Sequence, residues 1–284
     1  MLLLGYGYVA RHVAPRLLTR GWTVRATMRV PAAPAQGVAL FAYNAGGGLT
    51  ANMLAGVDHL LVSIPPDAQG DAAAADLRAA LSAGPHTLGW IGYLSATSVY
   101  GDRDGAWVDE TAEPRPSDGR GRRRLAAENQ WQAVGRDLAI ATHIFRLASI
   151  YGPGRNALQT VRAGLARRID KPGHYFSRIH VEDIAATILA STAHPRAGAI
   201  YNLADDAPAS SADVIAHACA LLGQAAPAAI GYDQAVTSMS EMARSFYADN
   251  KRIANGLIKQ ELGVRLAYPD YRSGLAALLT QEKL

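Results

Sequence analysis

The chain has 284 residues, 49% of them hydrophobic and 18% charged, which is enough for one large domain or for a domain with a smaller lobe. A single cysteine, Cys219, excludes an intramolecular disulfide framework and a cysteine metal cluster, and we expect a cytoplasmic protein. The net charge of +4 is spread along a chain without a nucleic-acid-binding motif or an apolar run of about 20 residues, so we expect neither nucleic acid nor a membrane as partner.

The first half of the chain alternates short apolar runs with helix-forming segments. The opening run MLLL stops at Gly5, too early for a signal peptide, and is predicted to form a strand. Strands are predicted over 2–5, 22–28, 38–43, 57–64, 87–95 and 139–147, and helices over 8–20, 68–83 and 119–136. This alternation predicts an α/β fold: a Rossmann-type, doubly wound parallel sheet over residues 1–150 that binds ligands at the carboxyl ends of its strands.

The pattern loosens in the second half, after the turn Gly152-Pro153-Gly154. Helices are predicted over 156–168, 181–193, 210–222 and 249–262, and short strands over 174–179 and 199–204. We expect residues 151–284 to form mainly a small C-terminal α/β lobe that binds the substrate and is interleaved with the end of the sheet.

A glycine-rich turn joins the first predicted strand to the first predicted helix. Its sequence, GYGYVA, fits the pattern G-x-G-x-x-A. The first glycine permits a tight turn, the second lets the backbone approach a pyrophosphate, and the alanine lets the helix pack on the strand. A plain glycine turn is the alternative. The residues predicted to bind a dinucleotide here are Gly5, Gly7, Tyr8, Val9 and Ala10.

The ends of three other strands complete the predicted cofactor site. The second strand ends with Thr27 and Arg29 and has no carboxylate to accept from a ribose 2′-hydroxyl, which favours NADP, with NAD as the alternative cofactor. A surface arginine without this role is the alternative interpretation of Arg29. Pro65, at the end of the fourth strand, is expected near the nicotinamide half of the cofactor. Ser63 and Ser95, at the ends of the fourth and fifth strands, are also predicted to bind the cofactor, and Ser95 could instead supply a hydroxyl to the reaction.

Five segments resemble the extended short-chain dehydrogenase/reductase family, also called the NAD-dependent epimerase/dehydratase family. They are YLSATSVYGD at 93–102, RLASIYGPGR at 146–155, RIHVEDIA at 178–185, YNLADD at 201–206 and the C-terminal stretch 250–275. The resemblance covers essentially the whole chain. It implies a Rossmann domain with a small substrate lobe, a nicotinamide dinucleotide cofactor and a small-molecule substrate with a carbonyl or sugar-like group.

The usual catalytic residues of that family are absent. Aligning LAAE at 125–128 with the L-x-x-E that follows the family's Tyr-x-x-x-Lys puts Arg120 at the tyrosine position and Arg124 at the lysine position. The family's Ser/Thr position is Ala96, and the resemblance is therefore to an atypical branch. An arginine stays protonated and is no ordinary general base. Arg124 could still bind ribose oxygens, and Arg120 could stabilise an oxyanion or clamp an acidic substrate.

Other side chains are candidates for the missing roles. We expect Thr97, Tyr100 or water to exchange the proton, and Tyr151 and Arg155 to position the substrate. Each of these side chains could instead only pack or bond to the backbone. Arg122 and Arg123 are expected on a solvated helix face.

His180 lies beside Glu182 and Asp183. A histidine paired with an aspartate could do acid–base work, but we favour an acidic side chain that caps a helix. No His or Cys spacing suits a metal.

Together these features favour an NADP-preferring oxidoreductase or epimerase. The alternative is a catalytically inactive NADP-binding sensor or scaffold protein, which the loss of the tyrosine and lysine favours. By analogy with the family, the helices predicted over 68–83 and 119–136 suggest a homodimer.

Overall fold

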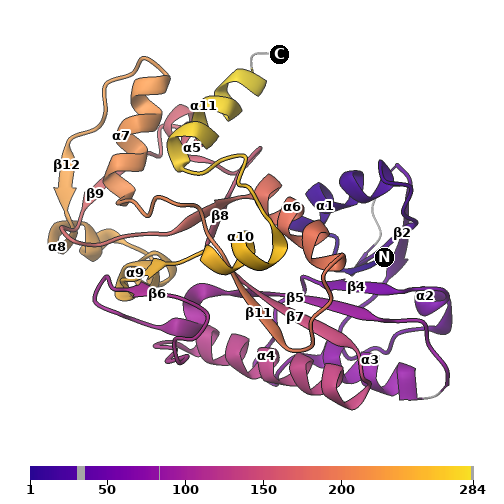
Figure 1. The fold of residues 1–284 in the computed structure, drawn as a ribbon. Coiled ribbons are helices and arrows are strands. Elements are labelled where there is room, and N and C mark those ends of the chain that lie inside the picture. The colour runs from indigo at the N-terminus through magenta and orange to yellow at the C-terminus, as the bar shows by residue number, and fades with distance from the viewer. Residues whose placement is uncertain (31–35, 83, 283–284) are drawn as a thin grey trace.

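The computed structural model describes residues 1–30, 36–82 and 84–282. Its centre is a seven-stranded sheet in the order β11-β7-β5-β4-β1-β2-β3, in which all neighbouring strands are parallel (Figure 1). The strands are β1 (Leu2–Leu4), β2 (Val24–Met28), β3 (Val38–Ala42), β4 (His59–Val62), β5 (Trp90–Ala96), β7 (Ala141–Leu147) and β11 (Ala199–Leu203). The strand order reverses between β1 and β4, and in such sheets this switch point is where ligands bind.

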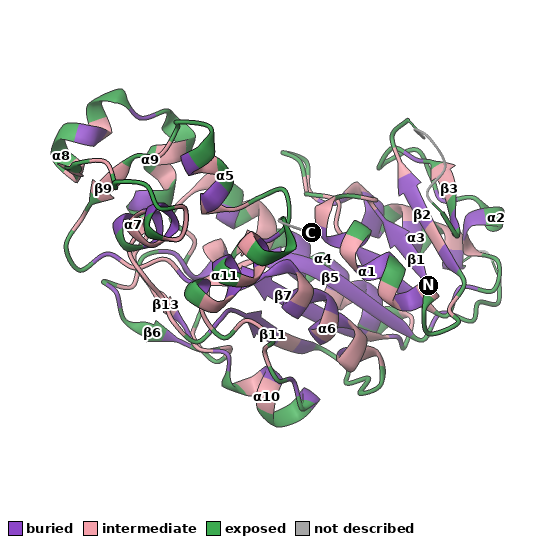
Figure 2. Cartoon of the chain, turned by 90° about the horizontal axis from the view of Figure 1, so that it is seen from above, coloured by how far each residue is buried: buried purple, intermediate pink, exposed green. Residues whose placement is uncertain are grey.

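Helices cover both faces of the sheet because its strands are apolar on both sides. The side chain of Leu3 packs with α1 (Tyr8–Leu18) and α6 (Val181–Thr192) in one core cluster. Leu2 and Leu4 point the other way and belong to a second cluster with α3 (Ala72–Ser82) and α4 (Gly119–Asp137). Figure 2 shows the strands as a buried layer between these helices. The short helix α2 (Ala51–Leu54) lies beside the second cluster.

The remaining elements form the lobe and its links to the sheet. Three two-stranded parallel pairs occur: β8 (Ser149–Tyr151) with β10 (Arg178–His180), β9 (Arg168–Asp170) with β12 (Ala229–Gly231), and β6 (Trp107–Val108) with β13 (Arg252–Ile253). The helices are α5 (Ala157–Arg162), α7 (Ser211–Leu221), α8 (Tyr232–Ala235), α9 (Glu241–Ala248), α10 (Gly256–Leu262) and α11 (Tyr271–Gln281), with 3₁₀ turns η1 (Thr97–Tyr100) and η2 (Val236–Ser238). The predicted Rossmann-type α/β fold with a small C-terminal lobe is therefore confirmed.

Several predicted elements of the lobe have different bounds. The helix predicted over 156–168 ends at Arg162, because Gly164 adopts a positive φ of 68° and the chain then enters β9. The helix predicted over 249–262 begins only at Gly256, because Arg252 and Ile253 form β13, which pairs with β6. The strand predicted over 174–179 is β10, shifted to 178–180. In the described part of the chain, no helix is both long and apolar enough to cross a membrane.

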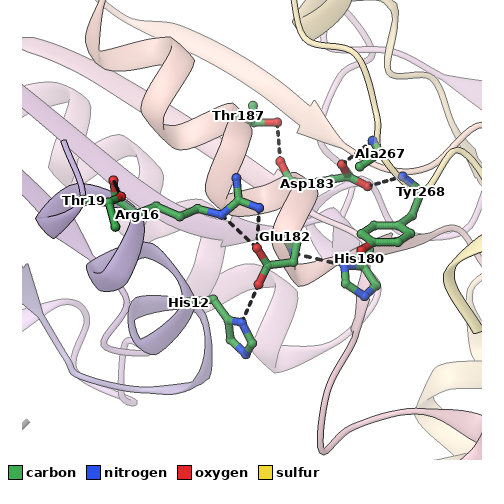
Figure 3. Close-up of polar contacts among 9 residues, drawn as sticks. All are labelled: His12, Arg16, Thr19, His180, Glu182, Asp183, Thr187, Ala267 and Tyr268. Atoms are coloured by element: carbon green, nitrogen blue, oxygen red, sulfur yellow. Dashed lines mark hydrogen bonds and ion pairs between the residues drawn. The ribbon is translucent and has the colours of Figure 1, made fainter. Parts of the chain in front are cut away.

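The start of α6 joins three parts of the chain (Figure 3). Glu182 accepts hydrogen bonds from His12 at 2.7 Å and from Arg16 Nε at 2.8 Å, which ties α6 to α1. Burial by itself raises the pKa of the Glu182 carboxyl, but these two partners outweigh it and lower that pKa. Asp183 accepts from the backbone N–H groups of Ala267 at 2.7 Å and Tyr268 at 3.1 Å, which holds the C-terminal segment on the sheet.

The helix cap differs from the one expected. The ring of His180, and not an acidic side chain, caps α6 by accepting from the Glu182 N–H at 3.2 Å. Burial lowers the pKa of His180 to about 4, so that the ring is neutral near pH 7 and can accept a hydrogen bond. The structure thus gives His180, Glu182 and Asp183 structural partners.

Replacing Asp183 by alanine tests the role of this tether. The Asp183→Ala variant leaves two part-buried backbone N–H groups without their carboxylate acceptor, and a hydrogen bond to a charged group contributes about 1.5–3 kcal/mol. We expect the free energy of unfolding, measured by urea titration, to fall by that order. The control is Asp213→Ala at the exposed first turn of α7, where the loss should stay below about 1 kcal/mol. Equal losses in the two variants would contradict the tether.

Candidate functional site

A cavity of about 650 Å³ opens at the carboxyl ends of the central strands, between the sheet and the lobe. The sheet side of its wall comes from the glycine-rich turn, from the residues after β4, and from the ends of β5 and β7. The opposite side comes from the start of α4 and from lobe segments near residues 155, 175 and 245–253. The cavity therefore lies at the switch point of the sheet, where a dinucleotide and a substrate could meet.

The glycine-rich turn is held in shape from both sides. Gly5 has a φ of +94°, and its N–H donates to Thr27 Oγ1 at 3.0 Å. On the other side, Ser63 Oγ donates to the Gly5 carbonyl at 2.7 Å. A Cβ at Gly5 would stand 2.8 Å from Ser63 Oγ, so this position needs glycine for both its conformation and its space. Ser63 and Thr27 thus shape the turn.

The second glycine of the turn leaves room for a ligand. Gly7 is the N-cap of α1 and has no side chain to cap the helix. Its φ of −87° is one that any residue can adopt. A Cβ built on Gly7 would meet no protein atom within 4 Å, and Gly7, Tyr8 and Val9 line the cavity. Ala10 is fully buried against the sheet. A pyrophosphate fits this geometry, because the helix N-terminus offers N–H groups and the positive end of its dipole.

Tyr8 joins the turn to the start of the lobe. Its hydroxyl donates to the Pro153 carbonyl at 2.9 Å, and the guanidinium of Arg155 lies 5.8 Å from its ring centroid. Burial raises the pKa of the Tyr8 phenol, so it stays protonated and keeps donating. Arg155, predicted to contact substrate, lines the cavity from this turn.

The two arginines at the altered catalytic positions both line the cavity but point in different directions. Arg124 donates to the Tyr93 hydroxyl and to the Leu94 carbonyl, both at 3.0 Å, which places its guanidinium against the end of β5. Arg120 donates to Ser245 Oγ on α9 and lies 5.9 Å from the Phe246 ring centroid, so it reaches across to the lobe. Arg123, which we expected on a solvated face, lines the cavity as well.

The hydroxyl candidates separate into those that line the cavity and those that do not. Thr97 lines the cavity at the start of η1. Tyr100 is fully buried and donates to Asn202 Oδ1 at 2.8 Å. Tyr151 donates to the Asp270 carbonyl at 3.3 Å from within the core of the lobe. Arg29 is exposed after β2 and does not line the cavity. The structure thus brings together Gly7, Tyr8, Val9, Ser63, Pro65, Ser95, Thr97, Arg120, Arg124 and Arg155.

A buried ion pair lies beneath the cavity and was not predicted. Arg146 NH2 stands 2.7 Å from Glu128 Oε2, and both side chains are only 3% exposed. Ser95 Oγ donates to the other carboxylate oxygen at 2.6 Å, so this hydroxyl is committed to the pair. Both residues lie in segments that resemble the family: Glu128 belongs to LAAE, and Arg146 opens RLASIYGPGR.

The charge of the cavity wall is predominantly positive. Five cations line it, against the two carboxylates Asp118 and Asp249; the cations are Arg120, Arg123, Arg124, Arg155 and Lys251. This surplus favours anionic ligands such as the phosphates of a dinucleotide or an acidic substrate. Among the described residues, no group of three or more His, Cys, Asp and Glu side chains could hold a metal ion.

Comparisons with known proteins agree with this fold. A model of the NAD dependent epimerase/dehydratase family matches residues 77–204. A functionally unknown conserved protein from Silicibacter pomeroyi DSS is 48% identical, with a TM-score of 0.91, over 99% of this chain and 98% of that one. Protein YeeZ of Escherichia coli strain K12 is 27% identical over 94% of this chain and 96% of its own length. MoeE5, solved in complex with UDP-glucuronic acid and NAD, shares the fold at 20% identity, with a TM-score of 0.80 over 100% of this chain and 99% of its own.

The buried pair can be tested through stability. The Arg146→Met variant leaves the Glu128 carboxylate buried and unpaired, which we expect to lower the free energy of unfolding by about 3–5 kcal/mol. The matched control is Arg115→Met, which removes an ion pair with Glu113 whose side chains are 67% and 71% exposed; there the loss should be at most about 1 kcal/mol. Urea unfolding of both variants gives the comparison, and similar losses would show that the buried pair has no special weight.

Proposed function

We propose that the chain is an atypical short-chain dehydrogenase/reductase of the NAD-dependent epimerase/dehydratase family, whose model matches residues 77–204, and that it binds NADP or NAD. Its proposed activity is that of an oxidoreductase or epimerase, acting on a carbonyl or sugar-like substrate that carries an acidic group. The observation that carries the proposal is the open space at Gly7, which faces the cavity at the N-terminus of α1. When bound, the nicotinamide supplies hydride chemistry that the side chains cannot.

NADP is the preferred cofactor in this proposal. The end of β2 carries Thr27 and Arg29 and has no carboxylate there to accept from a ribose 2′-hydroxyl. The exposed Arg29 is free to approach a 2′-phosphate, for which a guanidinium is a suitable donor. Thr27 is buried and serves the turn through Gly5.

The substrate class follows from the cations of the cavity. We assign Arg124 to ribose oxygens near the end of β5, and Arg120 and Arg155 to an acidic group of the substrate. Thr97 is assigned to the reacting oxygen, as a hydrogen-bond donor. The UDP-glucuronic acid named for the MoeE5 complex is an acidic sugar derivative and supports a substrate of this kind.

The second candidate function is a dinucleotide-binding sensor without turnover. It is favoured by the contacts of Arg120 with Ser245 and Phe246 on α9. The residue at the family's tyrosine position then links the sheet to the lobe. In that case cofactor binding would act on the position of α9, and no substrate would be turned over.

Cofactor binding can be separated from folding by two glycine variants. The Gly7→Ala methyl group meets no protein atom, so we expect a small change in stability but at least about tenfold weaker binding of NADPH and NADH, or about 1.4 kcal/mol. Gly5→Ala, by contrast, should destabilise the fold, because of its positive φ and its contact with Ser63. Isothermal titration calorimetry measures binding, with NADPH expected to bind more tightly than NADH and Arg29→Ser to remove that difference. Unchanged binding by Gly7→Ala would refute the site.

Turnover distinguishes the enzyme from the sensor. We expect the wild type to oxidise NADPH in the presence of carbonyl compounds that carry a carboxylate or phosphate, faster than with their neutral analogues, and the KM of Gly7→Ala for NADPH to be raised at least about tenfold. The loss of absorbance of the reduced nicotinamide is the readout. Binding of NADPH without turnover of any compound would favour the sensor. The double variant Arg120→Tyr with Arg124→Lys then tests whether the family's usual residues create activity in this cavity.

A further inference from the structure

The chain is almost free of lysine, and one of its few lysines lies in the cavity. The sequence has four, Lys171, Lys251, Lys259 and Lys283, and none in its first 170 residues. Lys251 lines the cavity, whereas Lys171 donates to the Tyr247 carbonyl and Lys259 pairs with Asp206 elsewhere in the lobe. The primary amine that the family places on the helix corresponding to α4 is missing there, and the lobe segment after α9 brings one to the cavity.

The ammonium of Lys251 is tied to the start of α4. Its Nζ stands 3.0 Å from Asp249 Oδ2, and the two side chains are only 11% and 14% exposed. The other oxygen of Asp249 accepts from Ser117 Oγ at 2.5 Å. Ser117 directly precedes Asp118, the N-cap of α4, and Arg120 follows within the first turn of this helix. The amine therefore lies near the start of α4, the helix on which the family carries its tyrosine.

The backbone holds Lys251 in place on both sides. The Asn250 N–H donates to Asp102 Oδ1 at 2.7 Å, and the Ile253 N–H donates to Ser177 Oγ at 3.0 Å. Ser177 and Ile253 line the same cavity. An ammonium has three N–H donors, and the bond to Asp249 uses one of them. The remaining donors can serve a ligand.

Among the cations of the cavity, Lys251 is the one that can release a proton. The four guanidiniums stay protonated at physiological pH. Of the phenols, Tyr8 is engaged with the Pro153 carbonyl, and the ring of Tyr175 lies 5.0 Å from the Arg252 guanidinium. Thr97 is a hydroxyl and can only pass on a proton that another group supplies.

We propose that Lys251 is a catalytic residue that donates the proton to the substrate oxygen, in the role that the family gives to its tyrosine. This role rests on the proposed function. In the reduction, the carbonyl carbon accepts a hydride from the reduced nicotinamide dinucleotide, and the C=O π electrons move to oxygen. The oxygen forms its O–H bond as one N–H bond of Lys251 breaks. The neutral amine then recovers a proton from water, so that carbonyl, reduced dinucleotide and one proton give alcohol and oxidised dinucleotide.

The surroundings of Lys251 make the transfer easier. Burial is the largest influence and lowers the pKa of the ammonium, and the nearby Arg103 lowers it further. Asp249 and Asp102 favour the charged form but do not outweigh burial. His174, whose own pKa is lowered mainly by burial, is a further titratable group near the amine. A pKa closer to neutrality suits a group that gives and recovers a proton.

The first test needs no substrate. Reductive methylation with ¹³C-formaldehyde labels the four lysines and the amino terminus, and single Lys→Arg variants assign the signals. In a pH titration by NMR we expect Lys251 to titrate below the ordinary range of a lysine ammonium, and Asp249→Asn to lower its pKa further. Titration of Lys251 within the ordinary lysine range would overturn the proposal.

The second test uses the best acidic carbonyl substrate. We expect Lys251→Met to lower kcat about 10²- to 10⁴-fold with the Kd for NADPH changed less than about twofold. Lys251→Arg keeps the charge but cannot donate the proton, so it should not restore the rate. The control Lys259→Met should behave as the wild type.

The outcomes separate this role from the proposed function. Restored turnover in Lys251→Arg would show that Lys251 only binds or supports, and full turnover in Lys251→Met with a loss in Tyr175→Phe would assign the proton to the phenol. Either result overturns the role of Lys251 and leaves the proposed function standing. Absence of turnover in the wild type would refute the proposed function and this role together.

Discussion

The buried pair of Glu128 and Arg146 is the interaction on which the geometry of the cavity depends. It joins α4 to β7, and the hydroxyl of Ser95 adds the end of β5. Two charges that are 3% exposed cannot be separated without leaving one of them unpaired in the interior. The start of α4 is therefore held over the ends of two central strands, and Arg124, one turn before Glu128, is placed where it can bond to the Leu94 carbonyl.

A second consequence is that ligand binding and proton transfer must come from different residues. Guanidiniums at the tyrosine and lysine positions bind anions and oxygens well but do not exchange protons. A site built from Arg120 and Arg124 therefore needs its proton from another part of the chain. In our proposal that part is the segment after α9, which brings Lys251 into the cavity through Asp249 and Ser117.

The lobe forms one side of the cavity and is linked to the rest of the chain by several contacts. Arg120 contacts α9, Tyr8 contacts the turn at Pro153, and Glu182 ties α6 to α1. The contacts of Arg120 and Tyr8 join the sheet to the lobe, whereas the contact of Glu182 joins two helices that cover the sheet. In the proposed function, a shift of the lobe would change the distances between the cations assigned to the substrate and the strand ends assigned to the cofactor.

Sequence patterns were sufficient for the features that are local. The turn from Gly5 to Ala10, the alternation of strands and helices, and the arginines at 120 and 124 follow from spacing within short segments, where chain geometry alone relates neighbouring residues. The same reasoning placed Tyr100 and Tyr151 beside the pocket, whereas the structure has their hydroxyls bonded to Asn202 and to the Asp270 carbonyl. Which face of a strand or turn a single side chain takes depends on packing partners that the local pattern does not contain.

By itself, the sequence determined the fold class and the glycine-rich turn, because each depends on residues close together in the chain. Only the tertiary structure decided which side chains from distant segments line the cavity. Ser117 and Asp249 are 132 residues apart, and their contact exists because β13 pairs with β6 and holds the segment of Lys251 at the cavity wall. Contacts at such separations are set by how the sheet and the lobe pack, and no spacing within a segment encodes them.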